Sequence, residues 1–416
     1  LSSIIGFDLV LDSTAESIYS NTNHPYINLI NIARLKNISL KEAWNVSSQT
    51  INWSKLDYLN RCINEFKKEN ELFDFTDMIV DYTKDSYVTN FDVLFIDEAQ
   101  DMPPIQYDMV EKLISNSKET FIAGDDDQAI FRWSGADVDR FINLKGNVTV
   151  LDKSYRCPKR VHRLANFIIT KVKNRRNKQW SPKDEDGKVY RHASLKHIDF
   201  SKGNWLVLGR TKKIRKDIIE NFFLEQGYWF GQGDKRPVAQ SVIDAIFTWK
   251  RLKSGQQINL KSAKNLYSKI KSQTKESSTG IKRGFKQLKN TSDDDMFTMK
   301  NLKENHGLLS DGDWYDVLDN VDGRDLTYIR RLEQIGEKID GDPRIKVSTI
   351  HMAKGGECDN VVVLTDLGPL VYKSYLKNPD DEHRVFYVAV TRAKHNLHII
   401  EPQKKLGYRI YGNEIN

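Results

Sequence analysis

The chain has 416 residues, of which 39% are hydrophobic and 29% are charged, and its formal net charge is +7. This composition is ordinary for a globular chain of two to four domains, and it excludes a collagen-like or low-complexity protein. The sequence has no run of about 18 apolar residues and no recognisable secretory signal, so we expect neither a membrane span nor secretion.

Residues 1–70 are polar and predict a group of small helices. Apolar side chains recur at helical spacing over residues 29–35 and again over 56–66, which indicates helices with one buried stripe each. Cys62, Cys157 and Cys358 are far apart and lack metal-ligand spacing, so we expect free thiols in a reducing cytosol.

From Phe91 onward, short apolar runs alternate with helical stretches. The runs that predict strands are 91–96, 120–123, 148–151, 205–208, 345–350, 361–364 and 397–400. One predicted helix lies near residues 213–226. This alternation is typical of an α/β fold with parallel sheets covered on both faces. Residues 237–340 are polar, rich in lysine and weakly helical, and they interrupt the pattern, so we expect an inserted helical subdomain.

Two carboxylates follow the strand predicted at residues 91–96. Ligands of α/β sheets bind beyond the carboxyl ends of the strands. A nucleoside triphosphatase needs one carboxylate near Mg²⁺ and often a second one to polarise water. The adjacent Asp97 and Glu98 can serve both purposes, because neighbouring side chains diverge at a strand end. For an isolated Asp-Glu pair, a solvated acidic turn is the alternative.

Several segments in one order resemble the UvrD/Rep-like (PcrA-like) family of superfamily 1 DNA helicases, which argues against the isolated turn. They are an acidic segment at Phe73–Asp77, Ile96–Asp101 (Walker B, motif II), Gly124–Ala136 (motif III), Ser154–Arg156 (motif IV), Ser348–Gly355 (motif V) and Val385–Lys394 (motif VI). The resemblance implies two RecA-like P-loop NTPase-type domains with helical insertions. It also implies ATP and Mg²⁺ as cofactors, and roles in DNA repair and replication.

The resemblance implies a role for each nucleotide-facing residue. Asp97 holds Mg²⁺, Glu98 activates the attacking water, and Gln128 senses the γ-phosphate. Arg156 and Arg392 reach the γ-phosphate from the second motor domain, where fixed guanidinium charge suits a phosphoryl group in transfer. The two residues proposed to contact the rest of the nucleotide are Tyr155, which stacks on adenine, and Glu357, which binds the sugar. A core aromatic is the alternative for Tyr155, and Gly356 and Cys358 depart from the family beside Glu357.

Phe131 and Trp133 match aromatics that stack on bases of the tracking single strand, and stacking tolerates any sequence. One face of a buried strand is the alternative for this pair. Ser134 replaces an arginine that is common in the family. Thr349 and His351 match residues near the DNA backbone. The basic residues within 171–178 either grip phosphates or form a solvated loop, and the lysines of 250–290 either contact duplex DNA or keep a surface soluble.

The phosphate-binding loop G-x-x-x-x-G-K-[ST] does not occur in this sequence. The one Gly-Lys pair, Gly187-Lys188, is followed by Val189 and has Pro182 at the position of the first glycine. In the family order this loop precedes residue 1, which is leucine, so we expect it on an upstream segment or on a separate chain. We expect little ATP hydrolysis by this chain alone.

The expected domains follow from these motifs. They are a remnant of a helical insertion (1–70), part of the first motor domain (71–151), the second motor domain (152–236 and 341–416) and its helical insertion (237–340). The implied activity is ATP-dependent movement along single-stranded DNA from 3′ to 5′ with unwinding of duplex DNA. The alternatives are a non-catalytic nucleic-acid-binding protein derived from a helicase, and a subunit completed by a Walker A chain. A nuclease-linked form ranks low, because no carboxylate-lysine cluster follows residue 394.

Overall fold

The computed structural model describes residues 25–47, 51–274, 278–288, 291–339, 341–403 and 405–410. The chain divides into two compact units. The first unit contains residues 1–185 and 373–391, and the second contains 186–372 and 392–415. The first 24 residues, which belong to the expected 1–70 remnant, lie outside the described residues.

The first unit begins with helices, as the spacing of apolar residues predicts. They are α2 (Pro25–Leu35), α3 (Leu40–Val46) and α4 (Trp53–Glu69). Leu29, Leu35, Leu56 and Leu59 are buried, and most of them join one small core with the other apolar residues of these helices. Polar caps define the helix starts: Ser39 forms a capping box with Glu42, and the Asn52 side chain accepts from the Lys55 amide.

The acidic segment Phe73–Asp77 begins α5 (Phe75–Lys84). Asp74 is the N-cap of this helix and forms a capping box with Asp77. Arg34 bridges both carboxylates, at 2.6 Å from Asp74 and 2.5 Å from Asp77, and Lys67 lies 3.0 Å from Asp74. Burial opposes ionisation of Asp74, but these cations outweigh it and hold the pKa of Asp74 well below its usual range. The segment therefore ties α5 to α2 and α4.

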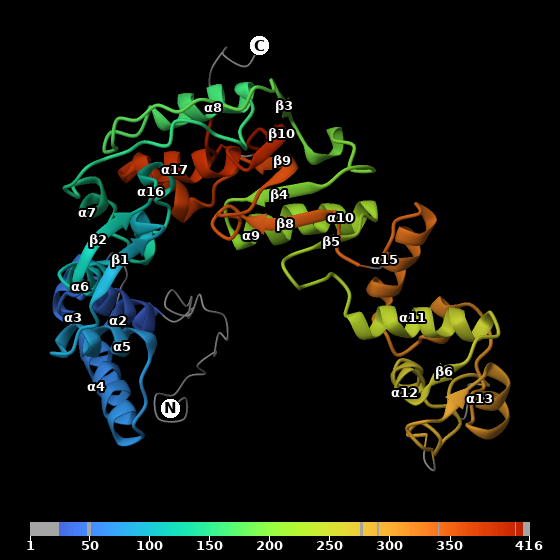
Figure 1. The fold of residues 1–416 in the computed structure, drawn as a ribbon. Helices are drawn as coiled ribbons and strands as arrows, with labels where there is room; N and C mark the ends of the chain where they lie inside the picture. Colours follow the sequence, from blue (N-terminus) through green and yellow to red (C-terminus); the bar gives the residue numbers. More distant parts are fainter. Residues whose placement is uncertain are drawn as a thin grey trace. The chain divides into compact units, whose positions relative to one another are not determined.

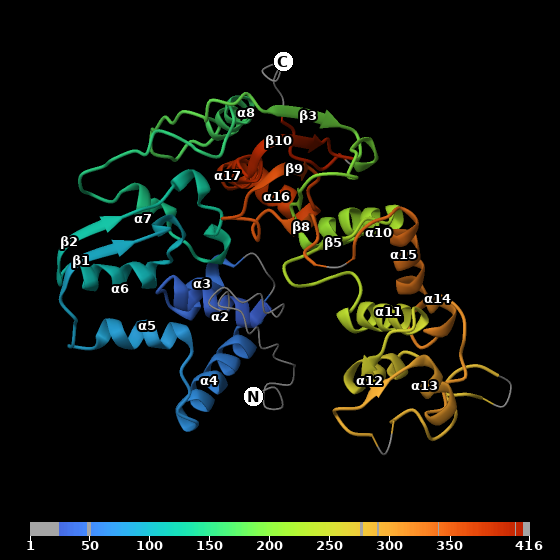
Figure 2. The same cartoon turned by 45° about the vertical axis from the view of Figure 1, so that its right-hand side comes forward.

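The sheet of the first unit consists of two parallel strands among the described residues, β1 (Phe91–Ile96) and β2 (Ser117–Ile122). Both were predicted. The connecting helix α6 (Pro104–Ile114) packs on one face of this sheet, with α5 on its far side, as Figure 2 shows. The rest of the first unit comprises α7 (Val138–Ile142), α8 (Lys159–Ile169), α17 (Pro379–Val390) and the 3-10 turns η2 (Ala99–Asp101), η3 (Asp126–Gln128) and η4 (Arg132–Ser134). The two longer helices, α8 and α17, pack on each other.

A six-stranded parallel sheet forms the centre of the second unit, in the order β3-β10-β9-β4-β8-β5 (Figure 1). The strands are β3 (Lys188–His192), β4 (Trp205–Gly209), β5 (Phe230–Gly231), β8 (Ile345–Thr349), β9 (Cys358–Leu364) and β10 (Ala393–Ile400). All residues of β4 are buried, which its unbroken apolar run predicts for a central parallel strand. This sheet and its helices confirm the predicted α/β class.

Shorter elements connect these strands. They are η5 (Leu195–His197), α9 (Lys212–Ile214), the π-helical segment η6 (Arg215–Glu220), α10 (Asn221–Gln226) and, partly in each unit, α16 (Pro369–Lys377). The helical stretch 212–226 matches the helix that the sequence predicts near 213–226.

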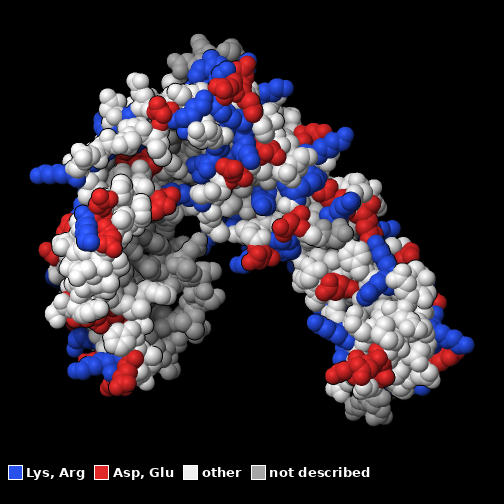
Figure 3. Space-filling view, viewed as in Figure 1, with Lys and Arg blue, Asp and Glu red and all other residues white. Residues whose placement is uncertain are grey.

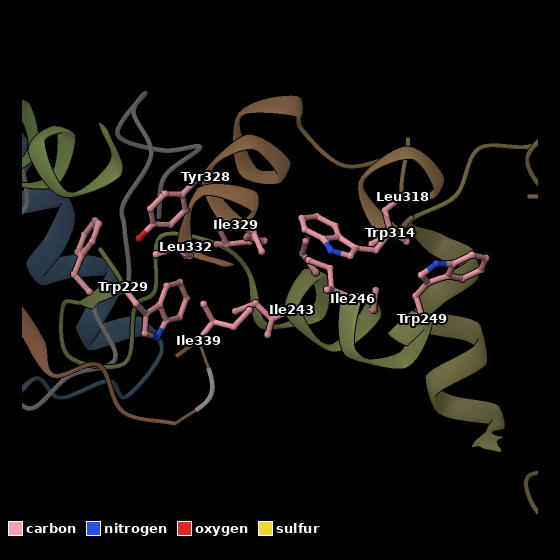
Figure 4. Close-up of a cluster of buried hydrophobic side chains, with 14 of the residues drawn as sticks. Trp229, Ile243, Ile246, Trp249, Trp314, Leu318, Tyr328, Ile329, Leu332 and Ile339 are labelled. Atoms are coloured by element: carbon pink, nitrogen blue, oxygen red, sulfur yellow. The ribbon is translucent and has the colours of Figure 1, made fainter. Parts of the chain in front are cut away.

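The interruption at 237–340 is mainly helical. It contains α11 (Gln240–Lys253), α12 (Leu260–Ser268), α13 (Met299–Asn305), α14 (Trp314–Val317), α15 (Gly323–Gln334) and the short antiparallel pair β6 (Ile258–Asn259) and β7 (Met296–Phe297). Figure 4 shows its core, where α11 contributes Ile243, Ile246 and Trp249, and α14 and α15 contribute Trp314 and Ile329. The indole of Trp249 is buried and donates to Gly312 O at 3.0 Å.

One predicted strand does not form, and two strands of the six-stranded sheet, β3 and β5, were not predicted. Residues 148–151 form no strand, and Leu151 is 87% exposed although it is apolar. Conversely, β3 was not predicted, because its sequence KVYRH is polar for a strand. Gly187-Lys188 lies where β3 begins, so the one Gly-Lys pair opens an edge strand. The expected free thiols are confirmed at all three cysteines.

Candidate functional site

The paired carboxylates lie where β1 ends. Ile96 is the last strand residue, and Glu98 adopts a left-handed backbone conformation with φ 52° and ψ 35°. A non-glycine residue pays about 1 kcal/mol for this conformation, so the surrounding contacts must hold it. Two backbone bonds do so: Ala123 N donates to Ile96 O at 2.7 Å, and Ala99 N donates to Ala123 O at 3.0 Å. The side chains of Asp97 and Glu98 are both exposed at this sharp turn.

Gln100 joins this turn to the loop after β2. Its side chain is buried, its Nε2 donates to Glu98 Oε2 at 2.6 Å, and its Oε1 accepts from the Asp125 amide at 2.9 Å. A Cβ at Gly124 would lie 2.5 Å from that Oε1 and 2.7 Å from the Phe141 ring, so only glycine allows this close approach. Gln100 was not predicted to have a role of its own. A buried amide next to paired acids is a signal that could have marked it, because buried amides need partners.

The predicted sensor Gln128 lies in the same loop. Its Nε2 donates to Asp125 Oδ2 at 2.7 Å. Glu98, Gln100, Asp125 and Gln128 are therefore linked one after another, which brings the predicted water-activating acid and the predicted sensor into one hydrogen-bonded set.

Three consecutive acids in this loop are buried to different degrees, and two cations, Lys178 and Arg175, bind their carboxylates. The carboxylates of Asp126 and Asp127 are 2% and 0% exposed, and that of Asp125 is 28% exposed. Lys178 contacts all three, with 2.9 Å from its Nζ to Asp125 Oδ1 and 3.2 Å to Asp127 Oδ2. Arg175 binds Asp127 through two parallel bonds of 2.8 and 2.6 Å. Such bidentate pairing is the strong form of an arginine-carboxylate contact.

The pKa shifts follow from this mixture of burial and pairing. Burial tends to raise the pKa of Asp125, but the charge of Lys178 and the bond from Gln128 outweigh it and lower that pKa. Burial raises the pKa of Asp127, although Arg175 opposes the rise. For Lys178, burial tends to lower the pKa and the three carboxylates raise it above its usual value. The lysine is therefore charged at neutral pH.

Helix α17 contributes the third cation, Arg384, which is buried. Its Nε donates to Asp126 O at 2.8 Å, and its Nη2 donates to Asn174 O. The backbone amide of Arg176 donates to Asp126 Oδ2 at 2.9 Å, while its guanidinium donates to carbonyl oxygens of Ile142 and Leu144. The acidic loop is thus enclosed by residues 174–178 and α17.

These contacts correct the interpretation of the basic residues within 171–178. Neither phosphate gripping nor a solvated loop describes Arg175 and Lys178, because both are mostly buried against carboxylates of residues 125–127. The guanidinium of Arg176 is bound to backbone carbonyls. Sequence reasoning missed the pairing because the partners lie about 50 residues apart. The run of three acids at 125–127 and the basic run within 171–178 were the available signal.

The predicted base-stacking aromatics lie beside the acidic loop in sequence. Phe131 and Trp133 flank the start of the 3-10 turn η4, and Trp133 is 51% exposed. Neither residue lies in a strand, so the alternative of a buried strand face is wrong. Ser134 donates to Phe131 O at 2.7 Å and is buried. This serine closes the turn.

The motif IV residues are also in the first unit. Tyr155 is 87% exposed, which excludes the alternative of a core aromatic. The backbone amide of Arg156 donates to Ser154 Oγ at 3.3 Å, and the amide of Cys157 donates to the same oxygen at 3.1 Å. Ser154 therefore shapes the short turn that carries both predicted nucleotide contacts.

The remaining predicted residues belong to the second unit. Arg392 is buried and its Nη1 donates to Gly356 O at 3.3 Å, while Glu357 lies 3.4 Å from Lys394. Thr349 ends β8 and accepts the Met352 amide through its Oγ1 at 3.4 Å, and His351 follows it in the same turn. Arg392 and Glu357 thus lie at the same end of the sheet, since each directly precedes a strand: Glu357 precedes β9 and Arg392 precedes β10.

The carboxylate at the strand end fits a magnesium ion whose other ligands are water and oxygens of a bound phosphate. Asp97 is an exposed carboxylate, and Mg²⁺ takes one or two protein carboxylates together with waters and phosphate oxygens. Across the described ranges, no group of three or more His, Cys, Asp or Glu side chains gathers as a metal cage. Within the same ranges, no helix has the length and apolarity to span a membrane.

The surface charge does not form one basic field on the face drawn in Figure 3. Lysine and arginine side chains there are interspersed with aspartate and glutamate. The chain has a net charge of +7, but its positive side chains are not concentrated on this face. Affinity for a polyanion is therefore not predicted from charge alone.

Comparison with known proteins gives consistent matches at both ends of the chain. Residues 10–149 match the UvrD/REP helicase N-terminal domain, and residues 345–400 match the UvrD-like helicase C-terminal domain. The chain is 32% identical over 136 residues to ATP-dependent DNA helicase PcrA of Bacillus subtilis (strain 168), which covers 29% of this chain and 18% of that protein. It is 29% identical over 192 residues to a probable DNA helicase II homolog of Mycoplasma genitalium, covering 38% and 27%.

The matched part therefore spans about a fifth to a quarter of the length of these relatives. A solved structure described as "The structure of PRRSV helicase" covers 75% of this chain and 35% of its own, at a TM-score of 0.27 and 11% identity, which is too low to carry an argument.

Proposed function

Because this chain belongs to the UvrD/PcrA-like superfamily 1 helicases, we propose that it is part of an ATP-driven motor that moves along single-stranded DNA and unwinds duplex DNA. The observation that carries the proposal is the hydrogen-bonded set Glu98–Gln100–Asp125–Gln128, beyond the ends of two adjacent parallel strands. That is where α/β sheets bind nucleotides.

In the proposed mechanism, each residue of the first unit has one task. Asp97 would hold Mg²⁺, which would polarise the phosphate and shield its charge. Glu98 accepts a proton from the attacking water. The amide of Gln128 donates to an oxygen of the γ-phosphate once it leaves Asp125, and so distinguishes a triphosphate from a diphosphate. Tyr155 offers an exposed ring to the adenine.

The arginines supply the charge that hydrolysis requires. Arg156 and Arg392 stabilise negative charge on the phosphoryl group in transfer, and Glu357 binds the nucleotide sugar. Phe131 and Trp133 stack on bases, and the exposed indole of Trp133 suits that role. Thr349 and His351 contact the DNA backbone. The direction of movement, 3′ to 5′, and a cytoplasmic location belong to the same proposal, together with roles in repair and replication.

We further infer that a segment carrying the phosphate loop completes the sheet of the first unit. The rings of Phe95 and Phe121 stack at 5.2 Å between centroids, yet they are 73% and 52% exposed, and Val93 is 43% exposed on the same face. Parallel sheets of α/β proteins are covered on both faces, and α6 covers the opposite one. An added helix and strand would bury these rings and bring the loop to the carboxyl ends of β1 and β2.

Phosphate release tests the proposal. We expect background ATP turnover by the chain alone, with or without single-stranded DNA. We expect DNA-stimulated turnover when the chain is joined to a family segment that carries the loop. Glu98→Gln should abolish this turnover, and the control Lys118→Met should leave it unchanged, because Lys118 is exposed and pairs with exposed Asp92 at 2.6 Å. DNA binding without turnover in the completed protein would favour a non-catalytic binding protein.

A further inference from the structure

The buried ion cluster around residues 125–127 has no role in the mechanism above, although it is attached to the sensor. Three like charges in sequence repel each other, and burial strengthens that repulsion. The loop adopts this conformation because Lys178 and Arg175 balance the charge. Arg175 engages Asp127 alone through its two bonds, whereas Lys178 reaches every acid of the loop.

Asp125 connects the cluster to the sensor. Its two oxygens have different partners: Oδ1 lies 2.9 Å from Lys178 Nζ, and Oδ2 accepts from Gln128 Nε2 at 2.7 Å. A carboxylate has only acceptor atoms, so the contact also fixes which end of the Gln128 amide faces Asp125. The Asp125 side chain additionally accepts from the Asp127 amide at 3.1 Å, which holds the carboxylate in the loop.

We propose that Lys178 is a positioning residue for the γ-phosphate sensor: by binding Asp125, it holds the Gln128 amide in one orientation before nucleotide arrives. The role of Gln128 as a γ-phosphate sensor rests on the proposed function. The orientation of its amide does not, because it follows from the contacts of Asp125. Lys178 acts through Asp125 and does not touch Gln128.

The arrangement has a chemical consequence for nucleotide binding. A γ-phosphate that takes the Gln128 donor must replace Asp125 as its acceptor. Lys178 keeps Asp125 ionised and satisfied after that exchange, so the carboxylate is not left buried without a partner. Without Lys178, the Asp125 carboxylate would lose one of its few contacts and would no longer be fixed in place, so the Gln128 amide would lose its single orientation.

The side-chain amide signal of Gln128 in the chain labelled with ¹⁵N-glutamine tests the orientation without nucleotide or DNA. The signal is assigned by its absence in Gln128→Leu. In Lys178→Met we expect the signal to shift and its exchange with solvent to accelerate by about tenfold or more, since a hydrogen bond to a charged group is worth at least that factor. Lys178→Arg should restore the native position, and Lys118→Met should have no effect.

A second variant separates positioning from simple stabilisation and guards against a Lys178 variant that does not fold. Asp125→Asn removes the charge that Lys178 binds while Asp126 and Asp127 keep their contacts with it. If Lys178 acts through Asp125, combining Lys178→Met with Asp125→Asn should shift the Gln128 amide signal no more than either single substitution does. An unchanged Gln128 signal in Lys178→Met or Asp125→Asn, or fully additive effects in the double variant, would overturn the proposal.

The outcome is independent of motor activity. If the completed protein hydrolyses no ATP, the proposed function fails while the Gln128 signal still reports on positioning. If it does hydrolyse ATP, we expect Lys178→Met to lower kcat by about tenfold with little change in KM, and Lys178→Arg to recover it. A rise in KM with kcat unchanged would contradict a role in orienting the sensor.

Discussion

Removing Arg175 should destabilise the acidic loop much more than the loss of a surface ion pair. The Asp127 carboxylate is fully buried and receives both bonds of the Arg175 guanidinium. Breaking a buried pair by removing one partner costs about 3–5 kcal/mol, because the other charge remains buried without its partner. Lys178 still lies 3.2 Å from Asp127 and offsets part of that cost. We therefore expect Arg175→Met to lower the local stability by about 2–4 kcal/mol.

Hydrogen exchange measured by mass spectrometry can resolve this effect, because it reports on separate segments where a single unfolding transition does not. Peptides that cover residues 124–130 and 174–180 should exchange faster in Arg175→Met, while peptides of β4 in the second unit serve as the internal reference. Asp127→Asn combined with Arg175→Met should recover most of the loss, since no unpaired charge then remains. A loss below about 1 kcal/mol, the value of an exposed pair, would refute the reasoning.

Three further perturbations follow from the same structure. Gly124→Ala should cost about 1–3 kcal/mol and accelerate exchange at residues 124–130, because the new Cβ would meet Gln100 and the Phe141 ring. Trp249→Ala should cost about 3–5 kcal/mol in urea unfolding of the second unit by leaving a cavity in the helical insertion; a cost below about 1 kcal/mol would contradict this packing. Burial and the nearby His192 lower the pKa of His398 from 6.5 to about 4, so its neutral form is favoured in the folded state. The resulting stabilisation is fully present above pH 6.5 and is lost as the pH falls toward 4. The loss is about 3 kcal/mol, because each pKa unit corresponds to about 1.4 kcal/mol, and His398→Gln should remove it from the pH dependence of unfolding.

The central strands could be predicted because a mostly apolar run of this length has few other uses in a protein of this size. β1, β4 and β9 all came from such runs. The same rule failed at 148–151, where the apolar run forms no strand and Leu151 is exposed. Apolarity shows that a segment can be buried, but pairing depends on a neighbouring strand, which a local pattern does not reveal.

The candidate site was predicted in part and for a different reason. Motif order identified Glu98 and Gln128, and the structure links them through Gln100 and Asp125. The partners of the acidic loop could not be predicted, because charge complementarity between distant segments has no local signature. Lys178 looked like a residue for solvent or phosphate until the fold placed it against three aspartates. The domain boundaries and the individual catalytic roles remain predictions.

The most direct test of the motor assignment is DNA-stimulated phosphate release by this chain, alone and completed with a phosphate-loop segment, each with and without Glu98→Gln. We expect background release by the chain alone, and stimulated release by the completed protein that depends on Glu98. Robust stimulated release by the chain alone would contradict the requirement for an added loop. A folded, DNA-binding completed protein without stimulated release would contradict the motor itself.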